Sequence, residues 1–257
     1  MTPARRVSRA LAALALIWAA AAAAPAARAA QCNPITHDGL DYTVCSARAG
    51  ADRLRLWHLA PDGTPYGGFG RVADRLARGD QRLRFAMNGG MFHSDRSAVG
   101  LLIIDGQERA PLITSAGPGN FGLLPNGVFC IAADRFAVIE TRAFAADRPD
   151  CRHATQSGPM LVIDGALHPR LLPDSTSRFV RNGVGVSADG QTAWLAISDQ
   201  QVTFHEFARL FRDGLGTPNA LFLDGNVSRL HAPGLGRSDW GLPIGPILGV
   251  AEPAPDR

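Results

Sequence analysis

The sequence predicts a β-rich α+β fold in a single domain, in which one or two helices pack on mostly antiparallel sheet. Short apolar runs that end at turn residues recur along the chain, and several end at an Asp-Gly pair. This pattern favours hairpins of antiparallel strands. Only one segment shows a clear helical periodicity. No low-complexity linker divides the chain, so we expect one large domain after an N-terminal leader.

Three hairpins are predicted where an apolar run leads into an Asp-Gly pair and a second run follows. They comprise residues 99–104 before Asp105-Gly106, residues 160–163 before Asp164-Gly165, and residues 184–186 and 192–198 around Asp189-Gly190. Two further strands are expected at residues 83–87 and in the apolar run before Asp224, and each leads into a polar motif.

The clearest helix begins after Thr203 and ends at Gly214. Thr203 and Glu206 have the spacing of a capping box, and glycine is typical of a helix end. Its apolar face consists of Phe204, Phe207, Ala208 and Phe211. A second helix is expected at residues 72–78, closed by Gly79.

The first 29 residues have the features of a cleaved signal peptide. Arg5, Arg6 and Arg9 precede an apolar run at residues 10–24, and Ala-Arg-Ala at 27–29 offers small residues for a signal peptidase. A membrane anchor is the alternative, but the run is shorter than the roughly 20 residues that a spanning helix needs. We therefore expect a signal peptide at 1–29, a functional domain at 30–257, no membrane span after cleavage, and a periplasmic or secreted protein.

The charge balance argues against nucleic acid as a partner. The chain has 26 basic and 23 acidic residues. Four of the basic residues and none of the acids precede residue 30, which leaves 22 against 23 and a net charge of −1. Every basic residue is arginine. Because there is no lysine, a Walker phosphate loop, a Schiff-base enzyme, a Ser-x-x-Lys acyl enzyme and a protein kinase are all excluded.

The four cysteines favour disulfides in an oxidising compartment. None of them has C-x-x-C spacing and no histidine cluster accompanies them, so we expect no zinc site and, more generally, no metal and no cofactor. Four cysteines allow three pairings, which the sequence does not distinguish. We favour the two local pairs, Cys32–Cys45 and Cys130–Cys151.

Four polar motifs are candidates for a functional site, although each has a simpler interpretation as a turn or a surface residue. The first is Asn88-Gly89-Gly90, followed closely by His93, and it also reads as an ordinary Asn-Gly turn. The second is Ser157-Gly158. A Gly-x-Ser-x-Gly elbow is absent around this serine, so a Ser-His-Asp hydrolase lacks support.

The third and fourth motifs carry charge. Arg181 stands at the start of an apolar strand, where an arginine can grip phosphate with two parallel N–H bonds. Asp224-Gly225 ends another apolar run and is followed by Ser228. Asp105 and Asp164 also sit in apolar-Asp-Gly contexts, but there the chain continues as a hairpin, whereas polar residues follow Asp224.

The four motifs in this order resemble the phosphodiester glycosidase family, over about residues 85–250. The family's Asn-Gly-Gly-x-Phe matches residues 88–92, and its Ser-Gly before a strand matches Ser157-Gly158. Its arginine four residues ahead of a strand glycine matches Arg181 and Gly185, and its Leu-Asp-Gly-Gly-Gly-Ser matches residues 223–228. The chain is most similar to a bacterial branch of small envelope proteins. One departure stands out: the glycine triplet is here Gly-Asn-Val, so side chains occupy positions where bare backbone could approach a ligand.

The resemblance implies hydrolysis of a sugar-1-phosphate phosphodiester in envelope or extracellular glycans. Phosphate is a good leaving group, so its protonation matters less than in ordinary glycosides. We expect Arg181 to bind the phosphate, Asp224 to stabilise an oxocarbenium ion or activate water, and Asn88 to complete the catalytic set. The expected substrate-binding residues are Gly89, Gly90, His93, Ser157, Gly158, Gly225 and Ser228.

A non-catalytic envelope protein that keeps this fold and binds a glycan or another protein is the alternative. The altered glycine triplet favours it, whereas retention of Asn88, Arg181 and Asp224 favours the enzyme. The two hypotheses differ in what they expect of the structure, because convergence of these three side chains within one pocket would favour the enzyme, whereas scattered positions would favour binding or scaffolding.

Overall fold

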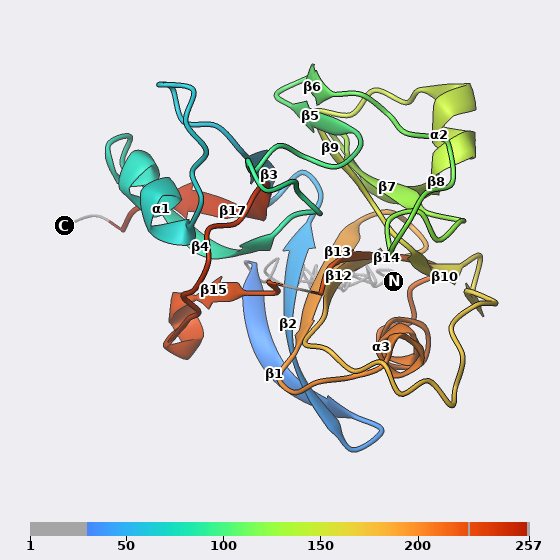
Figure 1. Cartoon of the computed structure of the whole chain (residues 1–257). Helices are drawn as coiled ribbons and strands as arrows, with labels where there is room; N and C mark the ends of the chain where they lie inside the picture. The colour runs from blue at the N-terminus through green and yellow to red at the C-terminus, as the bar shows by residue number, and fades with distance from the viewer. Residues whose placement is uncertain (1–29, 226, 256–257) are drawn as a thin grey trace, which may run out of the picture.

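The strands of the described residues form three antiparallel sheets that meet at the centre of the molecule (Figure 1). The computed structural model describes residues 30–225 and 227–255. The seven-stranded sheet has the order β1-β2-β13-β12-β14-β10-β11. Its strands are β1 (Gln31–His37), β2 (Leu40–Arg48), β13 (Thr192–Ser198), β12 (Asn182–Val186), β14 (Asn219–Asp224), β10 (Met160–Ile163) and β11 (Ala166–Leu167).

Two five-stranded sheets pack against it. We call them the β4 sheet, of order β16-β15-β4-β17-β3, and the β9 sheet, of order β6-β5-β9-β7-β8. The β4 sheet contains β16 (Arg237–Ser238), β15 (Leu230–Ala232), β4 (Gln81–Asn88), β17 (Ile247–Pro253) and β3 (Arg53–Trp57). The β9 sheet contains β6 (Gln107–Ala110), β5 (Leu102–Ile104), β9 (His153–Ser157), β7 (Gly127–Ile131) and β8 (Phe136–Glu140). The β-rich antiparallel α+β fold predicted from the sequence is confirmed.

The three predicted hairpins are present. Asp105-Gly106 has φ of 50° and 74°, and Asp164-Gly165 has φ of 46° and 82°. Positive φ at both central residues is the geometry of a type I′ turn, whose twist matches that of the flanking strands. The Asp38-Gly39 pair joins β1 to β2 with φ of 52° and 75°. That hairpin carries the same signal and was not predicted.

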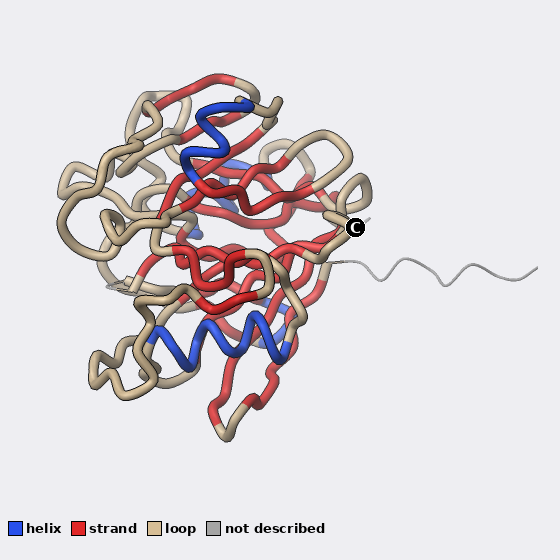
Figure 2. The backbone as a smooth tube through the Cα atoms, turned by 90° about the vertical axis from the view of Figure 1, so that its right-hand side faces the viewer, coloured by secondary structure: helices blue, strands red, loops and turns tan. Residues whose placement is uncertain are grey.

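The helices lie at the periphery of the strands (Figure 2). They are α1 (Phe69–Ala77), α2 (Thr141–Asp147) and α3 (Phe204–Arg209), and α3 continues as a π-helical turn, η1 (Leu210–Gly214), while η2 (Pro233–Leu235) is a short 3₁₀ turn. The predicted capping box of α3 is confirmed, since Glu206 N donates to Thr203 Oγ1 and Thr203 N to Glu206 Oε2. Helix α1 begins three residues before the predicted segment. Helix α2 was not predicted; Glu140 caps its first turn.

The largest apolar cluster lies between the three sheets. It includes Leu56, Met87, Phe129, Leu195 and Leu221, all fully buried. A second cluster fills the space between α3 and the seven-stranded sheet, with Phe207 and Phe211 packed against that sheet. These two cores hold the ends of β4, β9, β12 and β14 in fixed positions, and these strand ends carry the four motifs.

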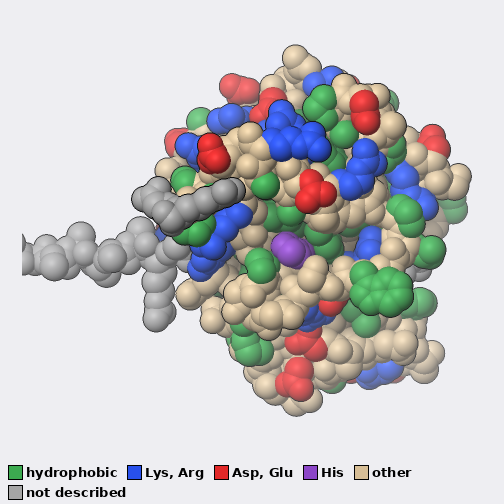
Figure 3. All heavy atoms as spheres, turned by 90° about the vertical axis from the view of Figure 1, so that its left-hand side faces the viewer, with side chains coloured by type: hydrophobic (Ala, Val, Ile, Leu, Met, Phe, Trp, Pro, Cys, Tyr) green, Lys and Arg blue, Asp and Glu red, His purple; other side chains and the backbone are tan. Residues whose placement is uncertain are grey.

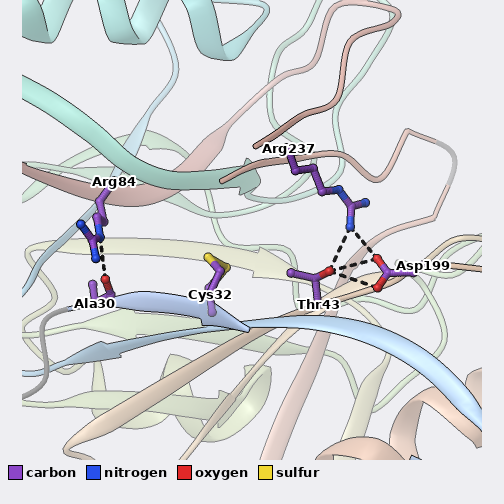
Figure 4. Close-up of a disulfide and its surroundings, with 7 residues drawn as sticks. Ala30, Cys32, Thr43, Arg84, Asp199 and Arg237 are labelled. Atoms are coloured by element: carbon purple, nitrogen blue, oxygen red, sulfur yellow. Dashed lines mark hydrogen bonds and ion pairs between the residues drawn. A yellow bond between two sulfur atoms is a disulfide. The ribbon is translucent and has the colours of Figure 1, made fainter. Parts of the chain in front are cut away.

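Each of two disulfides joins neighbouring segments of a single sheet, and a few polar contacts link different sheets. Cys32 pairs with Cys45 and Cys130 with Cys151, as favoured from the sequence. Figure 4 shows Arg237 of β16 meeting Asp199 and Thr43, which joins the β4 sheet to the seven-stranded sheet. Arg84 of β4 donates to the carbonyl oxygen of Ala30. The disulfides are typical of an oxidising compartment.

The predicted signal peptide at 1–29 lies outside the described residues. Within the described part of the chain, no helix has the length and apolar character needed to cross a membrane.

Candidate active site

The four sequence motifs meet where the three sheets join. Asn88 ends β4, Ser157 ends β9, and Asp224 ends β14. Asn182, which follows Arg181, begins β12 and lies opposite Asp224 in the antiparallel ladder. Residues that are far apart in the sequence are therefore brought together by strand ends, which are held more rigidly than loops.

A chain of hydrogen bonds links Asn88 to the Asp224 turn. Asn182 Nδ2 donates to the Asn88 carbonyl oxygen at 2.8 Å, and Asn182 Oδ1 lies 3.2 Å from Ser228 Oγ. Ser228 Oγ lies 2.8 Å from the Asp224 carbonyl oxygen, the shorter of its two contacts. Because a hydroxyl carries a single proton, Ser228 donates fully to only one of these acceptors at a time.

The side chain of Asn88 has a spare donor. Its Oδ1 accepts from the backbone N–H of Arg229 at 3.0 Å, and this bond fixes the orientation of the amide. Asn88 is fully buried, and its Nδ2 has no hydrogen-bond partner among the described residues. An unpaired buried donor is unfavourable, so it marks a place for an ordered water or a ligand group.

Hydrogen bonds join the end of β9 to β14 and to the residue that follows β4. Ser157 Oγ donates to the Leu223 carbonyl oxygen at 2.9 Å, and Thr155 Oγ1 donates to the Gly89 carbonyl oxygen at 2.8 Å. Ser157 is fully buried. Its hydroxyl therefore connects β9 to β14 immediately before Asp224.

A cavity of about 540 Å³ opens beside the Asp224 turn. This volume is within the usual range of small-molecule sites. Its wall combines Phe92, Arg96, Phe121, Asp224, Gly225 and Val227 with a few further residues. Among the described residues that line it, Asp224 is the only acid and Arg96 the only base.

Asp224 is 6% exposed and forms part of the cavity wall. Its Oδ1 accepts from the backbone N–H of Gly225 at 2.6 Å. This short bond orients the carboxylate relative to its own turn, so Asp224 is a fixed anionic group next to a ligand-sized space.

Arg181 lies behind the Asp224 turn and does not line the cavity. It is 1% exposed, its Nε donates to the Val202 carbonyl oxygen at 2.9 Å, and its Nη2 donates to the Ser177 carbonyl oxygen at 3.1 Å. Its guanidinium carbon stands 3.6 Å from the centre of the Phe204 ring. Burial lowers the pKa of Arg181 to about 10, so the side chain remains a cation at neutral pH.

The buried cation is nevertheless close to the site. A Cβ placed on Gly225 would lie 3.7 Å from Arg181 Nη1. Within the described residues, no carboxylate forms an ion pair with Arg181, and aromatic faces and carbonyl oxygens surround its charge. The three residues expected to converge thus lie side by side, but only Asp224 reaches the cavity wall.

The motif glycines have packing reasons of their own. A Cβ on Gly89 would lie 2.9 Å from Leu56 Cδ2, one on Gly90 2.7 Å from Thr155 Oγ1, and one on Gly158 2.6 Å from Asn126 Cβ. A larger residue at any of them would clash with these neighbours unless they moved. Their direct contact with substrate stays a prediction, whereas Gly225 does line the cavity.

His93 lies outside the cavity wall, in an exposed turn. Its backbone N–H donates to the Ser97 carbonyl oxygen, and its carbonyl accepts from Arg96 N. Among the described residues, no group of three or more metal-ligating side chains gathers in one place.

The departure from the family's glycine triplet has a visible consequence. Val227 occupies the third position of the triplet and lines the cavity together with Phe92 and Pro243. Asn226 lies outside the described residues. An isopropyl group therefore replaces open space in the cavity wall, which narrows the site and makes it more apolar.

Two residues of this region, Asn182 and Arg96, were not predicted from the sequence. Asn182 lies directly after Arg181, and its buried amide is the link between β4 and the Asp224 turn. Arg96 follows His93 in the loop after the Asn-Gly-Gly motif. Its position near a motif was the one available signal, and arginine is too common in this chain for that signal to stand out.

A larger cavity, of about 660 Å³, lies between β3, α1 and β6 and is lined by Arg55, Arg75 and Arg109. Figure 3 shows the face that carries α1, where arginine side chains form several groups. None of the four motifs contributes to the wall of this cavity, so the smaller cavity at Asp224 is the better candidate for the active site.

Comparisons with known proteins agree with the motifs. The family model described as phosphodiester glycosidase matches residues 81–232. The uncharacterized protein YigE of Escherichia coli K12 is 33% identical over 190 residues, which cover 74% of this chain and 73% of YigE.

Two solved structures have a similar fold. The catalytic domain of zebrafish N-acetylglucosamine-1-phosphodiester α-N-acetylglucosaminidase, auto-inhibited by its pro-peptide, superposes with a TM-score of 0.57 at 16% identity, covering 86% of this chain and 81% of that one. A protein of Burkholderia pseudomallei K96243 superposes with a TM-score of 0.51 at 12% identity, covering 82% of this chain and 74% of that one.

Proposed function

The chain belongs to the phosphodiester glycosidase family, and on this premise we propose that it is an exported glycosidase that hydrolyses a sugar-1-phosphate phosphodiester in envelope or extracellular glycans. One observation carries the proposal beyond family membership. The described wall of the cavity holds a single carboxylate, Asp224. Ordinary glycosidases need two carboxyl groups, because one of them must protonate a poor leaving group. A phosphate leaving group does not need that proton.

In the proposed reaction the bond between the anomeric carbon and the phosphate oxygen breaks. Its electron pair leaves with the phosphate, and water supplies the hydroxyl group that the anomeric carbon gains. Asp224 stabilises the positive charge that develops on the sugar ring, or takes the proton from the attacking water. The short bond from Gly225 N to Asp224 Oδ1 supports this role, since it holds the carboxylate in place before substrate binds.

Arg181 acts on the phosphate through its field in this proposal. A cation that is buried behind Gly225 is poorly screened, so it stabilises an anion in the adjacent cavity more strongly than a surface arginine would. The absence of an acidic partner among the described residues supports the role, because the substrate's phosphate would then be the balancing charge.

The remaining motif residues would position the sugar and the water. The unpaired Nδ2 of Asn88 is a donor for a water or a sugar hydroxyl. Ser157 and Ser228 hold the Asp224 turn through the carbonyl oxygens of Leu223 and Asp224. Gly89, Gly90, Gly158 and Gly225 would let backbone amides approach the ligand, and His93 would contact it from the loop after the Asn-Gly-Gly motif.

A non-catalytic glycan- or protein-binding role is the second candidate. The observation that favours it is Val227, whose side chain occupies cavity space that the family's glycine leaves open. The two disulfides suit an exported protein in either case.

The test is hydrolysis of a chromogenic panel of sugar-1-phosphate diesters by the mature protein, its Asp224→Asn variant and a control, Asp189→Asn. Asp189 lies in the exposed turn between β12 and β13 and does not line the cavity. We expect one or more diesters to be cleaved by the wild type and the control, and the rate to fall at least about 100-fold in Asp224→Asn. A well-folded protein that cleaves no diester would favour the binding role.

A further inference from the structure

The loop after the Asn-Gly-Gly motif brings a second arginine to the cavity. We propose that Arg96 binds the phosphate of the substrate directly and so makes the site selective for anionic leaving groups. This inference deepens the proposed function and rests on it for the identity of the reaction, while the phosphate contact itself can be measured independently.

The cavity contains one positive and one negative side chain among its described residues. Arg96 and Asp224 both line it, and the rest of the described wall is apolar or uncharged. A glycosyl phosphate is a matching ligand, since its anomeric carbon becomes positive during the reaction while its phosphate is negative throughout. Asp224 complements the first centre and Arg96 the second.

Arg96 is available for a ligand. Within the described residues it forms no ion pair, and its one side-chain hydrogen bond runs from Nη1 to the Ser94 carbonyl oxygen at 3.1 Å. The guanidinium carbon lies 5.3 Å from the centre of the Phe92 ring, and that ring is itself part of the cavity wall. Several N–H donors thus remain for the bidentate contact that arginine makes with phosphate.

Arg181 cannot replace it in direct contact. Its Nε and Nη2 are bonded to carbonyl oxygens, it is 1% exposed, and it does not line the cavity. The two arginines therefore have different parts in the proposed site: Arg181 supplies a fixed field from behind, and Arg96 supplies the contact.

The turn that carries Arg96 is strained and tightly held. Arg96 has φ of 75°, a left-handed conformation that is uncommon for residues other than glycine. Such conformations persist where the surroundings enforce them, and they gather at ligand sites. Here Arg96 N donates to the His93 carbonyl oxygen at 2.9 Å, and Asp95 Oδ1 accepts from Ser97 Oγ at 2.6 Å.

His58 anchors the turn from outside. Its Nε2 lies 2.8 Å from the Arg96 carbonyl oxygen, which can only accept, so Nε2 carries the hydrogen and donates it. His58 is 8% exposed and lies just beyond β3, in the β4 sheet region. It is a positioning residue: it touches no ligand, but it ties the backbone of Arg96 to a rigid part of the fold.

The experiment compares Arg96→Gln with wild type on two substrates that carry the same sugar. One is a sugar-1-phosphate diester, which releases an anionic phosphate monoester. The other is a nitrophenyl glycoside, whose aglycone carries no charge when it is bound to the sugar. A charged hydrogen-bonded contact corresponds to about a 10- to 100-fold change in affinity. We expect kcat/KM for the diester to fall about 10- to 100-fold more than kcat/KM for the nitrophenyl glycoside. His58→Gln should shift the same ratio in the same direction by a smaller factor, and the control Arg109→Gln, in the other cavity, should leave the ratio unchanged.

A titration with inorganic phosphate, followed by NMR, separates this inference from the proposed function. If the wild type cleaves neither substrate, the proposed function fails, but phosphate binding that is weakened about 10-fold or more in Arg96→Gln and kept in Arg109→Gln still supports the site. Equal phosphate binding by wild type and Arg96→Gln overturns the inference. An equal loss of kcat/KM on both substrates in Arg96→Gln would also overturn the inference. The proposed glycosidase activity would still stand in that case.

Discussion

Replacing Arg181 with methionine separates its structural contribution from its proposed electrostatic one. The usual pKa of an arginine is 12.5, and burial lowers that of Arg181 to about 10. This lowering reflects the burial of the charged side chain, which the surrounding contacts must offset.

Loss of the side chain removes contacts that the buried groups around it need. The two hydrogen bonds to Val202 and Ser177 have buried carbonyl oxygens as acceptors, and each oxygen that loses its donor costs about 1–3 kcal/mol. The ring of Phe204, 3.6 Å from the guanidinium carbon, loses its packing partner as well. After part of this cost is offset by relief of the buried charge, we expect a net loss of about 2–5 kcal/mol.

Arg181→Met should therefore lower the free energy of unfolding by about 2–5 kcal/mol, because methionine fills part of the space but donates no hydrogen bond. The assay is urea unfolding followed by circular dichroism with the disulfides intact. Arg178→Met is the matched control: Arg178 forms an exposed ion pair with Glu206, and its loss should change stability by less than about 1 kcal/mol. If Arg181→Met is as stable as the wild type, the contacts of the Arg181 side chain do not stabilise the folded protein and the prediction is wrong.

Three further changes have calculable effects. Desolvation lowers the pKa of His153 from 6.5 to about 4. Between these two pH values His153 is therefore protonated in the unfolded chain but neutral in the folded protein. Stability should fall by up to about 3 kcal/mol between pH 6.5 and 4, and His153→Gln should remove this part of the pH dependence. Replacing Cys130 and Cys151 with serine removes a disulfide between residues 21 positions apart in the sequence. Because the unfolded chain then gains freedom, stability should fall by about 3 kcal/mol, measured by thermal unfolding. In Gly185→Ala the new Cβ would stand 2.7 Å from Phe211 Cδ1, so we expect a loss of about 1–3 kcal/mol in urea unfolding.

Each of these predictions has an outcome that would contradict it. If His153→Gln shows the same loss of stability between pH 6.5 and 4 as the wild type, another group causes the acid sensitivity. For the glycine, Gly70→Ala in α1 meets no atom within 4 Å and should stabilise the protein slightly. A variant that lacks Cys130–Cys151 and keeps the melting temperature of the wild type would contradict the estimate for this disulfide.

Local signals in the sequence were sufficient for much of the fold. The Asp-Gly pairs at 105–106 and 164–165 predicted hairpins because a type I′ turn demands positive φ, which those residues tolerate. The capping box at Thr203 and Glu206 located α3. Helix α2 was not predicted because it has only 7 residues and is capped by Glu140, a residue type that is not a usual N-cap.

The arrangement of the site depends on long-range contacts that no local pattern contains. Asn182 and Asn88 are 94 residues apart, and their bond exists because two sheets meet at those strand ends. The burial of Arg181 likewise needs rings from Phe179, Phe204 and Phe222, which belong to three separate segments. The motif order pointed to the right family, whereas the depth of each side chain followed from packing.

The most direct test of the central claim is hydrolysis of a cleavable sugar-1-phosphate diester in oxygen-18 water, with wild type and Asp224→Asn. If water attacks the anomeric carbon, the label enters the hydroxyl group on that carbon and the released phosphate stays unlabelled. We also expect turnover to be lost in Asp224→Asn. Label in the phosphate would mean that water attacks phosphorus, and unchanged turnover in Asp224→Asn would remove the carboxylate from the mechanism; either result would contradict a glycosidase that works through Asp224.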